Sequence, residues 1–275
     1  MHGVEMSIET NVENLQSCSS DFDSLFNYLK KKGRNHNNYK SYSSIGRVVD
    51  IRDSKKLYLS TGYDWNDISD RNRFNSDDYG VLHFGKCFSY STDESVAMWM
   101  LYGGIDKRSG MIDFTKKGMQ GILSIPQIEF GYSDGDRGFV VEKTLTSDSF
   151  DLYCVDIVYY KARQNAYYIK RSDEHGSLDP SIFNRLSICK KAYPWQYEKE
   201  CRLVCSVDKK LLSNDCYVAR IDLDGLDLGK SLEKTYHGPN FPSIDTYNTL
   251  PSSLDNSIDW SLCDGPCDKL GNAEE

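Results

Sequence analysis

Hydrophobic and polar residues repeat along the chain with two periods, and each period predicts a different kind of element. Apolar residues spaced three and four apart indicate short amphipathic helices. These helices are expected at residues 21–33, 45–51, 95–102 and 180–188, with a further short element at 119–125. Asp21 and Ser44 stand where helix N-caps are expected, and Gly33 follows the first apolar stripe.

Alternation of apolar and polar residues predicts the strands. They are expected at residues 39–43, 56–60, 81–88, 111–114, 139–145, 152–160, 195–207 and 217–223, with one more before Gly238. Because strands outnumber helices and the helices lie mostly early in the chain, we expect an α+β fold. Residues 1–20 are expected to form a polar leader, 21–250 a single domain, and 251–275 an acidic, flexible tail.

Composition limits the classes of function. The chain has 275 residues, of which 39% are hydrophobic and 27% charged, and its net charge is −8. This balance is typical of a globular protein and disfavours a broad electrostatic footprint for DNA or an anionic membrane. No apolar run approaches the roughly 18 residues of a membrane span, and the N-terminus lacks a signal-peptide core, so a cytoplasmic location is expected.

The nine cysteines do not form a disulfide or metal pattern. Most of them lie in apolar strand-like runs and are expected to be small buried residues: Cys87, Cys154, Cys201, Cys205 and Cys216. Cys263 and Cys267 form a C-x3-C pair, but no matching histidine or cysteine pair stands nearby. No metal site is therefore expected.

The strongest candidate chemistry lies in Trp195–Val207, written WQYEKECRLVCSV. Glu198, Glu200 and Arg202 stand two residues apart, which places them on one face of an extended strand. Two carboxylates and a guanidinium are too costly to bury without partners. This stretch therefore forms either a solvated, ion-paired sheet face or the wall of a polar cleft.

A second candidate lies where the strand at 81–88 leads into the helix at 95–102. Ser89, Ser91 and Thr92 precede that helix, and a helix N-terminus favours a phosphate or ribose ligand. An ordinary helix cap explains the same residues. Trp99, Met98 and Trp195 are expected to be core residues.

Several motifs, in order, resemble those of a bacterial family catalogued as a domain of unknown function. They are YKSYSSI, KLYLS, WND, CFSYSTDESVAMWMLYG, WQYEKECR and YHGPN, and they span about residues 38–240. That family is distantly similar to the ADP-ribosyltransferase fold, in which a split, mostly antiparallel sheet with flanking helices clasps NAD. The resemblance implies the same architecture here.

The resemblance also implies roles for particular residues. The catalytic glutamate of such transferases falls at Glu200, and Glu198 matches the two-glutamate form. Glu200 would stabilise the ribosyl cation, and Glu198 would orient or deprotonate the acceptor. Arg202 would either pair with the NAD diphosphate or hold Glu200 in place.

Contacts to NAD are implied on the earlier strands. They fall at Ser41, Tyr42, Ser89, Tyr90, Ser91 and Tyr102, and either Tyr90 or Tyr102 would stack on nicotinamide or adenine. Where the family often has histidine before the tyrosine, this chain has Ser41, with Lys40 beside it. This departure affects which residue of the first strand would contact the ribose of NAD.

The function implied by the resemblance is an NAD-consuming ADP-ribosyltransferase of the kind used as a bacterial toxin or antiviral defence effector. Its acceptor would be a macromolecule, either protein or nucleic acid, and an antitoxin or other inhibitor protein would restrain it. Two alternatives stay open, an NAD glycohydrolase and a catalytically silent module that binds a nucleotide or a protein. A local basic groove would favour RNA, although the same residues suit a solvated helix end: Lys30–Lys32, Arg34, Lys55 and Lys56.

Overall fold

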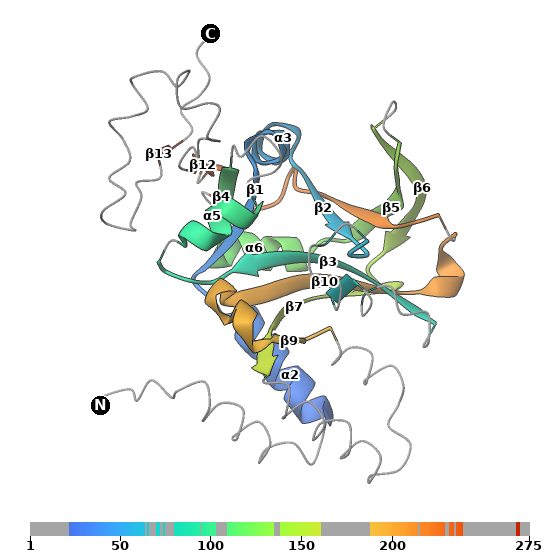
Figure 1. Ribbon diagram of the computed structural model, residues 1–275. Coiled ribbons are helices and arrows are strands. Elements are labelled where there is room, and N and C mark those ends of the chain that lie inside the picture. Colours follow the sequence, from blue (N-terminus) through green and yellow to red (C-terminus); the bar gives the residue numbers. More distant parts are fainter. Residues whose placement is uncertain are drawn as a thin grey trace.

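The structure is a computed structural model, which describes residues 22–63, 65, 70–71, 74, 80–93, 95–102, 109–134, 138–160, 188–213, 215–228, 231–233, 235–238 and 268–269. Within these residues, four α-helices flank the sheet (Figure 1). They are α2 (Phe22–Gly33), α3 (Ile45–Ser54), α5 (Val96–Tyr102) and α6 (Lys116–Leu123). Three 3-10 helices follow later in the chain: η1 (Tyr193–Glu198), η2 (Lys209–Leu211) and η3 (Ser231–Glu233).

Strands make up most of the regular structure. They are β1 (Asn38–Ser44), β2 (Lys56–Ser60), β3 (Val81–Ser89), β4 (Ser109–Thr115), β5 (Gln127–Asp134), β6 (Gly138–Thr146), β7 (Phe150–Asp156), β8 (Val158–Tyr160), β9 (Lys190–Ala192), β10 (Glu200–Asp208), β11 (Val218–Asp222), β12 (Thr235–His237) and β13 (Asp268–Lys269). All but β8 and β9 belong to one sheet, and every pairing in that sheet is antiparallel. The α+β prediction is confirmed.

The sheet forks at β3. On one edge β3 pairs with β10 over its whole length, and β7 lies beyond β10. On its other edge β3 pairs with β1 through Lys40 and Ser89, and with β2 through Ser60 and Gly85. One arm then continues through β4, β12 and β13, and the other through β11, β5 and β6. Helix α3 links β1 to β2 and therefore bridges the two arms (Figure 1).

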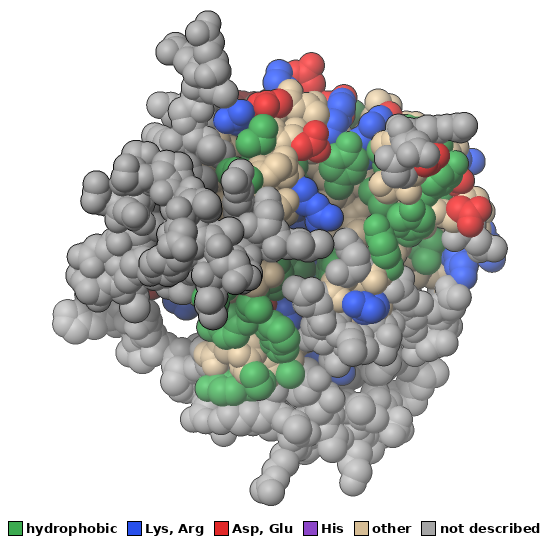
Figure 2. Space-filling view, turned by 45° about the horizontal axis from the view of Figure 1, so that its top comes forward, with side chains coloured by type: hydrophobic (Ala, Val, Ile, Leu, Met, Phe, Trp, Pro, Cys, Tyr) green, Lys and Arg blue, Asp and Glu red, His purple; other side chains and the backbone are tan. Residues whose placement is uncertain are grey.

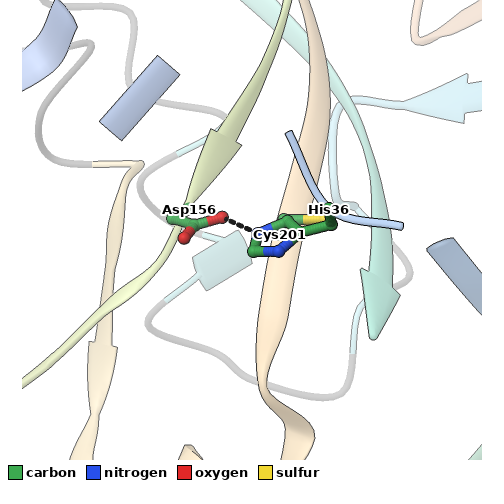
Figure 3. Close-up of side chains that lie close together, drawn as sticks. All are labelled: His36, Asp156 and Cys201. Atoms are coloured by element: carbon green, nitrogen blue, oxygen red, sulfur yellow. Dashed lines mark hydrogen bonds and ion pairs between the residues drawn. The ribbon is translucent and has the colours of Figure 1, made fainter. Parts of the chain in front are cut away.

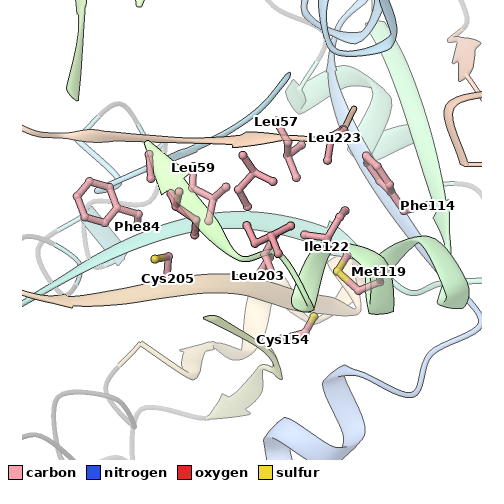
Figure 4. Close-up of a cluster of buried hydrophobic side chains, with 14 of the residues drawn as sticks. Leu57, Leu59, Phe84, Phe114, Met119, Ile122, Cys154, Leu203, Cys205 and Leu223 are labelled. Carbon is pink, nitrogen blue, oxygen red and sulfur yellow. The ribbon is translucent and has the colours of Figure 1, made fainter. Parts of the chain in front are cut away.

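The main hydrophobic core covers one face of the forked sheet. Alternate residues of several strands point into it, among them Leu57 and Leu59 of β2 and Leu203 and Cys205 of β10 (Figure 4). Helix α6 closes this core with Met119 and Ile122, both fully buried. The side chains between these strand residues point to the opposite face, where the polar site lies.

The amphipathic helix expected from residue 21 is α2. Its apolar residues pack on the face of the sheet opposite the main core. Phe26 and Leu29 pack against Tyr153 and Val155 of β7 in a second, smaller core. The predicted leader, 1–20, and most of the predicted helix at 180–188 lie outside the described residues. No described helix is long and apolar enough to cross a membrane.

Three predictions about elements need correction. The strand expected at 195–207 begins only at Glu200, because the preceding residues form η1. Strand β5 was not expected as a strand, because glycines and polar residues obscure its alternation. In the tail, where no regular structure was expected, Asp268–Lys269 pairs with β12.

Candidate functional site

A cleft of about 610 Å³ opens at the fork between β1 and β2. Its floor is the end of β3 from Gly85 to Ser89, and the start of β10 contributes Glu200. Helix α3 contributes Arg47 and Asp50. The fork therefore creates the cleft directly, because β1 and β2 leave the same edge of β3 at different points.

Five buried charged side chains meet at one end of this cleft. Arg202 donates through Nε to Glu200 Oε1 at 2.5 Å and through Nη2 to Asp70 Oδ2 at 2.6 Å. Lys191 Nζ lies 2.9 Å from Glu200 Oε2 and 2.5 Å from Glu198 Oε2. Each of these side chains is at most 4% exposed. The two glutamates therefore share Lys191, and Arg202 binds only Glu200.

Local backbone geometry brings the two glutamates together. Glu198 ends η1, and Lys199 adopts a left-handed conformation with φ of 42° before β10 begins at Glu200. This turn, rather than strand alternation, places both carboxylates on Lys191. Tyr102 of α5 donates to Glu198 Oε1 at 2.7 Å, and the backbone N–H of Glu200 donates to the Tyr159 hydroxyl at 2.8 Å.

The two carboxyl groups differ in proton affinity. Burial, followed by the charge of Glu200, raises the pKa of Glu198 to about 7. Burial alone would raise the pKa of Glu200 too, but the charges of Arg202 and Lys191 outweigh it and hold that pKa well below its usual range. Near neutral pH, Glu200 is a carboxylate and Glu198 exchanges a proton readily.

Most of the predicted contact residues do meet at the cleft. Ser41 and Tyr42 of β1, Ser89 of β3 and Tyr102 of α5 all line it, together with Glu198 and Glu200. Arg202 is fully buried and does not line it. Its guanidinium donates to Glu200, Asp70 and the Ile188 carbonyl, so Arg202 holds Glu200 in place.

Tyr90 and Ser91 were placed at the site by the resemblance, but neither lines the cleft. Tyr90 packs against the main core and stacks on His36 with ring centroids 4.0 Å apart. The Ser91 carbonyl accepts from Asn38 Nδ2 at 3.1 Å. Both residues follow the end of β3, so strand alternation no longer determines which way their side chains point.

His36, Asp156 and Cys201 offer ligand atoms within 4.8 Å of one another (Figure 3). His36 Nε2 and Asp156 Oδ1 already form a hydrogen bond of 2.6 Å. Cys201 is fully buried, and burial raises the pKa of its thiol well above the usual range. His36 and Asp156 are already bonded to each other, and the raised pKa of Cys201 disfavours the thiolate that a metal would need, so we assign no metal to these residues.

Lys191, Asp70 and Trp195 belong to the site, although sequence reasoning did not select the first two and placed Trp195 in the core. Trp195 lines the cleft, and Lys191 Nζ lies 4.9 Å from its ring centroid. Lys191 is only seven residues before Glu198, a spacing that η1 turns into direct contact. The pair Lys190-Lys191, set between Cys189 and Ala192, was the available signal.

Three of the six residues that could form a basic groove, Lys30, Lys55 and Lys56, pair with acids. Lys55 Nζ lies 2.7 Å from Asp224, Lys56 Nζ 2.5 Å from Asp222 and Lys30 Nζ 3.8 Å from Asp151. On the face shown in Figure 2, acidic and basic side chains are interspersed among the coloured atoms. This distribution gives no support to an RNA groove at these lysines.

Comparisons with known proteins do not identify a family for this chain, so its function is inferred from the geometry of the site. No protein-family model, no curated protein and no solved structure matches the chain.

Proposed function

We propose that the protein is an NAD-consuming ADP-ribosyltransferase that modifies a macromolecule. The observation that carries the proposal is a pair of carboxyl groups with opposed proton affinities at one end of a cleft. Pairs of this kind divide acid-base and electrostatic roles between two residues. The cleft adds Trp195 and Tyr102, whose flat faces suit a nicotinamide ring.

Each glutamate has a distinct role in this reaction. When the bond between nicotinamide and ribose breaks, nicotinamide leaves with the bonding electrons and the ribose becomes an oxocarbenium-like cation. Glu200 is ionised and fixed by Arg202 and Lys191, so it offers a preorganised negative charge to that cation. A nucleophile on the acceptor then attacks ribose C1, and its proton passes to the Glu198 carboxylate.

One observation favours a silent binding module as the second candidate. Both oxygens of Glu200 already accept hydrogen bonds, from Arg202 and Lys191, and the side chain is 2% exposed. A carboxylate has about four lone-pair sites, so acceptor capacity remains toward the cleft. Activity measurements decide between the two candidates.

The test is to incubate the full chain with labelled NAD and cell lysate and to follow two products separately. Nicotinamide release reports bond cleavage, and label in macromolecules reports transfer. We expect Glu200→Gln to lose at least about a hundredfold in nicotinamide release, as when one strong electrostatic stabiliser is removed. Glu198→Gln should retain cleavage and lose transfer, because its role concerns the acceptor.

The control is Glu142→Gln, since Glu142 is exposed and lies outside the cleft. Transfer by the parent chain should also rise with pH up to about 7, the pKa of Glu198, and any residual transfer by Glu198→Gln should not follow this dependence. A folded Glu200→Gln protein that releases nicotinamide at the parent rate overturns the catalytic role of Glu200. A parent chain that releases nicotinamide but transfers no label to macromolecules is an NAD glycohydrolase instead.

A further inference from the structure

The cleft has a second end, and its chemistry is aromatic. Tyr58 of β2, Tyr63 after β2 and Phe139 of β6 all line it. Tyr58 and Phe139 are half-buried, while Tyr63 is 46% exposed. Large aromatic side chains that face a cleft rather than a core indicate a ligand surface.

Curling of the second arm brings Tyr58 and Phe139 together. Strands β11 and β5 lie between β2 and β6, so a flat sheet would put Tyr58 at least about 14 Å from Phe139. The two ring centroids are in fact 5.7 Å apart, at an interplanar angle of 72°. The arm therefore curls into a concave wall. Arg220 packs on Phe139, with its guanidinium carbon 4.5 Å from the ring centroid.

The strand register sets the spacing between the carboxylate end and Ser60, which lies between Tyr58 and Tyr63 in the chain. Along β3, Glu200 pairs with Ser89, and Ser60 of β2 pairs with Gly85. Four residues of strand separate these two points, which corresponds to about 13 Å. This is the order of separation expected between the two ring systems of an extended dinucleotide, rather than of a single nucleoside.

A basic side chain lines the cleft next to the fork. Arg47 lies on α3, the helix that bridges the arms. At the carboxylate end, by contrast, Lys191 is held by Glu198 and Glu200. Arg47 is thus a cleft residue that can pair with an anionic linker between two rings.

We propose that Tyr58, Tyr63 and Phe139 form the subsite for the purine base of a dinucleotide, with Arg47 on its diphosphate. The base stacks against the exposed face of Tyr63 and the curled wall. This subsite rests on the proposed function, because it assumes that the reactive end of the same ligand lies at Glu198 and Glu200. Base stacking on aromatic side chains supplies binding without base-specific hydrogen bonds.

Calorimetric titration of the purified full chain with three probes tests the subsite. The probes are adenosine monophosphate, ADP-ribose and nicotinamide mononucleotide. Tyr63→Ala and Phe139→Leu should each weaken binding of the two adenine-containing probes about tenfold, because one stacking contact is lost. Both variants should leave nicotinamide mononucleotide binding unchanged.

The matched control is Tyr28→Ala, since Tyr28 is also exposed, at 43%, but lies on α2 and does not line the cleft. Circular dichroism melts should show that all variants are folded. If the parent binds ADP-ribose and both cleft variants bind it equally well, the subsite is wrong while the proposed function stands. If the parent binds none of the probes at millimolar concentration, the proposed function and the subsite both fail.

Discussion

At the scale of single residues, Glu198 and Glu200 share Lys191 but differ in what else surrounds them. Arg202 adds a second positive charge to Glu200, whereas Glu198 receives only a neutral donor, the Tyr102 hydroxyl. Burial disfavours both charges, and the second cation decides which glutamate stays ionised. Their spacing in the sequence predicted that they belong together, but not this asymmetry, because the left-handed turn at Lys199 leaves only Glu200 in contact with Arg202.

The raised pKa of Glu198, about 7, makes folding stability depend on pH. Between pH 4.5 and 7 the folded chain keeps a proton at Glu198 that the unfolded chain has released, so the free energy of unfolding falls as pH rises. The expected loss is about 3 kcal/mol over this range. Urea unfolding at pH 5 and pH 7.5 measures it, and Glu198→Gln should lack this component. Equal pH dependence in parent and variant would contradict the assignment.

Glu200 behaves in the opposite sense. Its pKa is held below the usual range by Arg202 and Lys191, which outweigh burial, so its contribution is present above pH 4.5. That contribution is lost as pH falls below this value.

Removing Lys191 leaves two buried carboxyl groups without their shared cation. We expect Lys191→Met to lower the free energy of unfolding at pH 7 by about 3–5 kcal/mol, since breaking a buried ion pair strands a charge. Lys117→Met is the control, because Lys117 pairs with Asp227 at the surface with both side chains more than 60% exposed. The control should change stability by about 1 kcal/mol or less. Similar urea midpoints for both variants would refute the role given to Lys191.

At the scale of elements, Gly85 sets how closely the site can pack on β3. A Cβ atom there would lie 2.5 Å from Phe74 Cε1 and 3.1 Å from Trp65. The rings of Trp65 and Phe74 in turn lie 5.4 and 5.5 Å from the guanidinium carbon of Arg202. Glycine at this position therefore allows two aromatic rings to cover the buried charges.

Gly85→Ala should consequently lower the free energy of unfolding by about 1–3 kcal/mol through overpacking. Gly46→Ala is the matched control in α3, where an added Cβ meets nothing within 4 Å. It should raise stability by about 0.5–1 kcal/mol, as alanine usually does in a helix. Guanidinium unfolding of the two variants gives both values, and a neutral Gly85→Ala would show that the rings are not closely packed on β3.

The elements that sequence patterns predicted well are those with strong local signals. The stripe of α2, the start of α3 after Ser44 and the alternation of β2, β3 and β11 all correspond to regular elements near their expected bounds, although the Ser44 side chain makes no capping hydrogen bond. Residues 195–199 were misread because alternating charges resemble a strand, while Pro194 and the left-handed Lys199 produce a 3-10 turn. The fork was beyond such reasoning, since it depends on pairings between strands far apart in the chain.

At the scale of the whole molecule, the cleft is a product of sheet topology. Both arms are anchored on β3. The residues that line the cleft come from β1, β2, β3 and β10, among other elements, and from α3, which bridges the arms. A ligand that spans the fork contacts both arms at once. Its binding should therefore stabilise the whole domain rather than one segment.

NAD should then raise the unfolding temperature by mass action. At a concentration one hundred times the dissociation constant, the expected gain is about 2.7 kcal/mol, or roughly 5 °C for a chain of this size. Two serines near the end of β3 provide a matched test, because Ser89 lines the cleft and Ser91 is buried outside it. Ser89→Ala should reduce the shift, and Ser91→Ala should retain it. Thermal melts unmoved by millimolar NAD in the folded parent would rule out a dinucleotide at the fork, and equal shifts in both serine variants would place NAD elsewhere on the molecule.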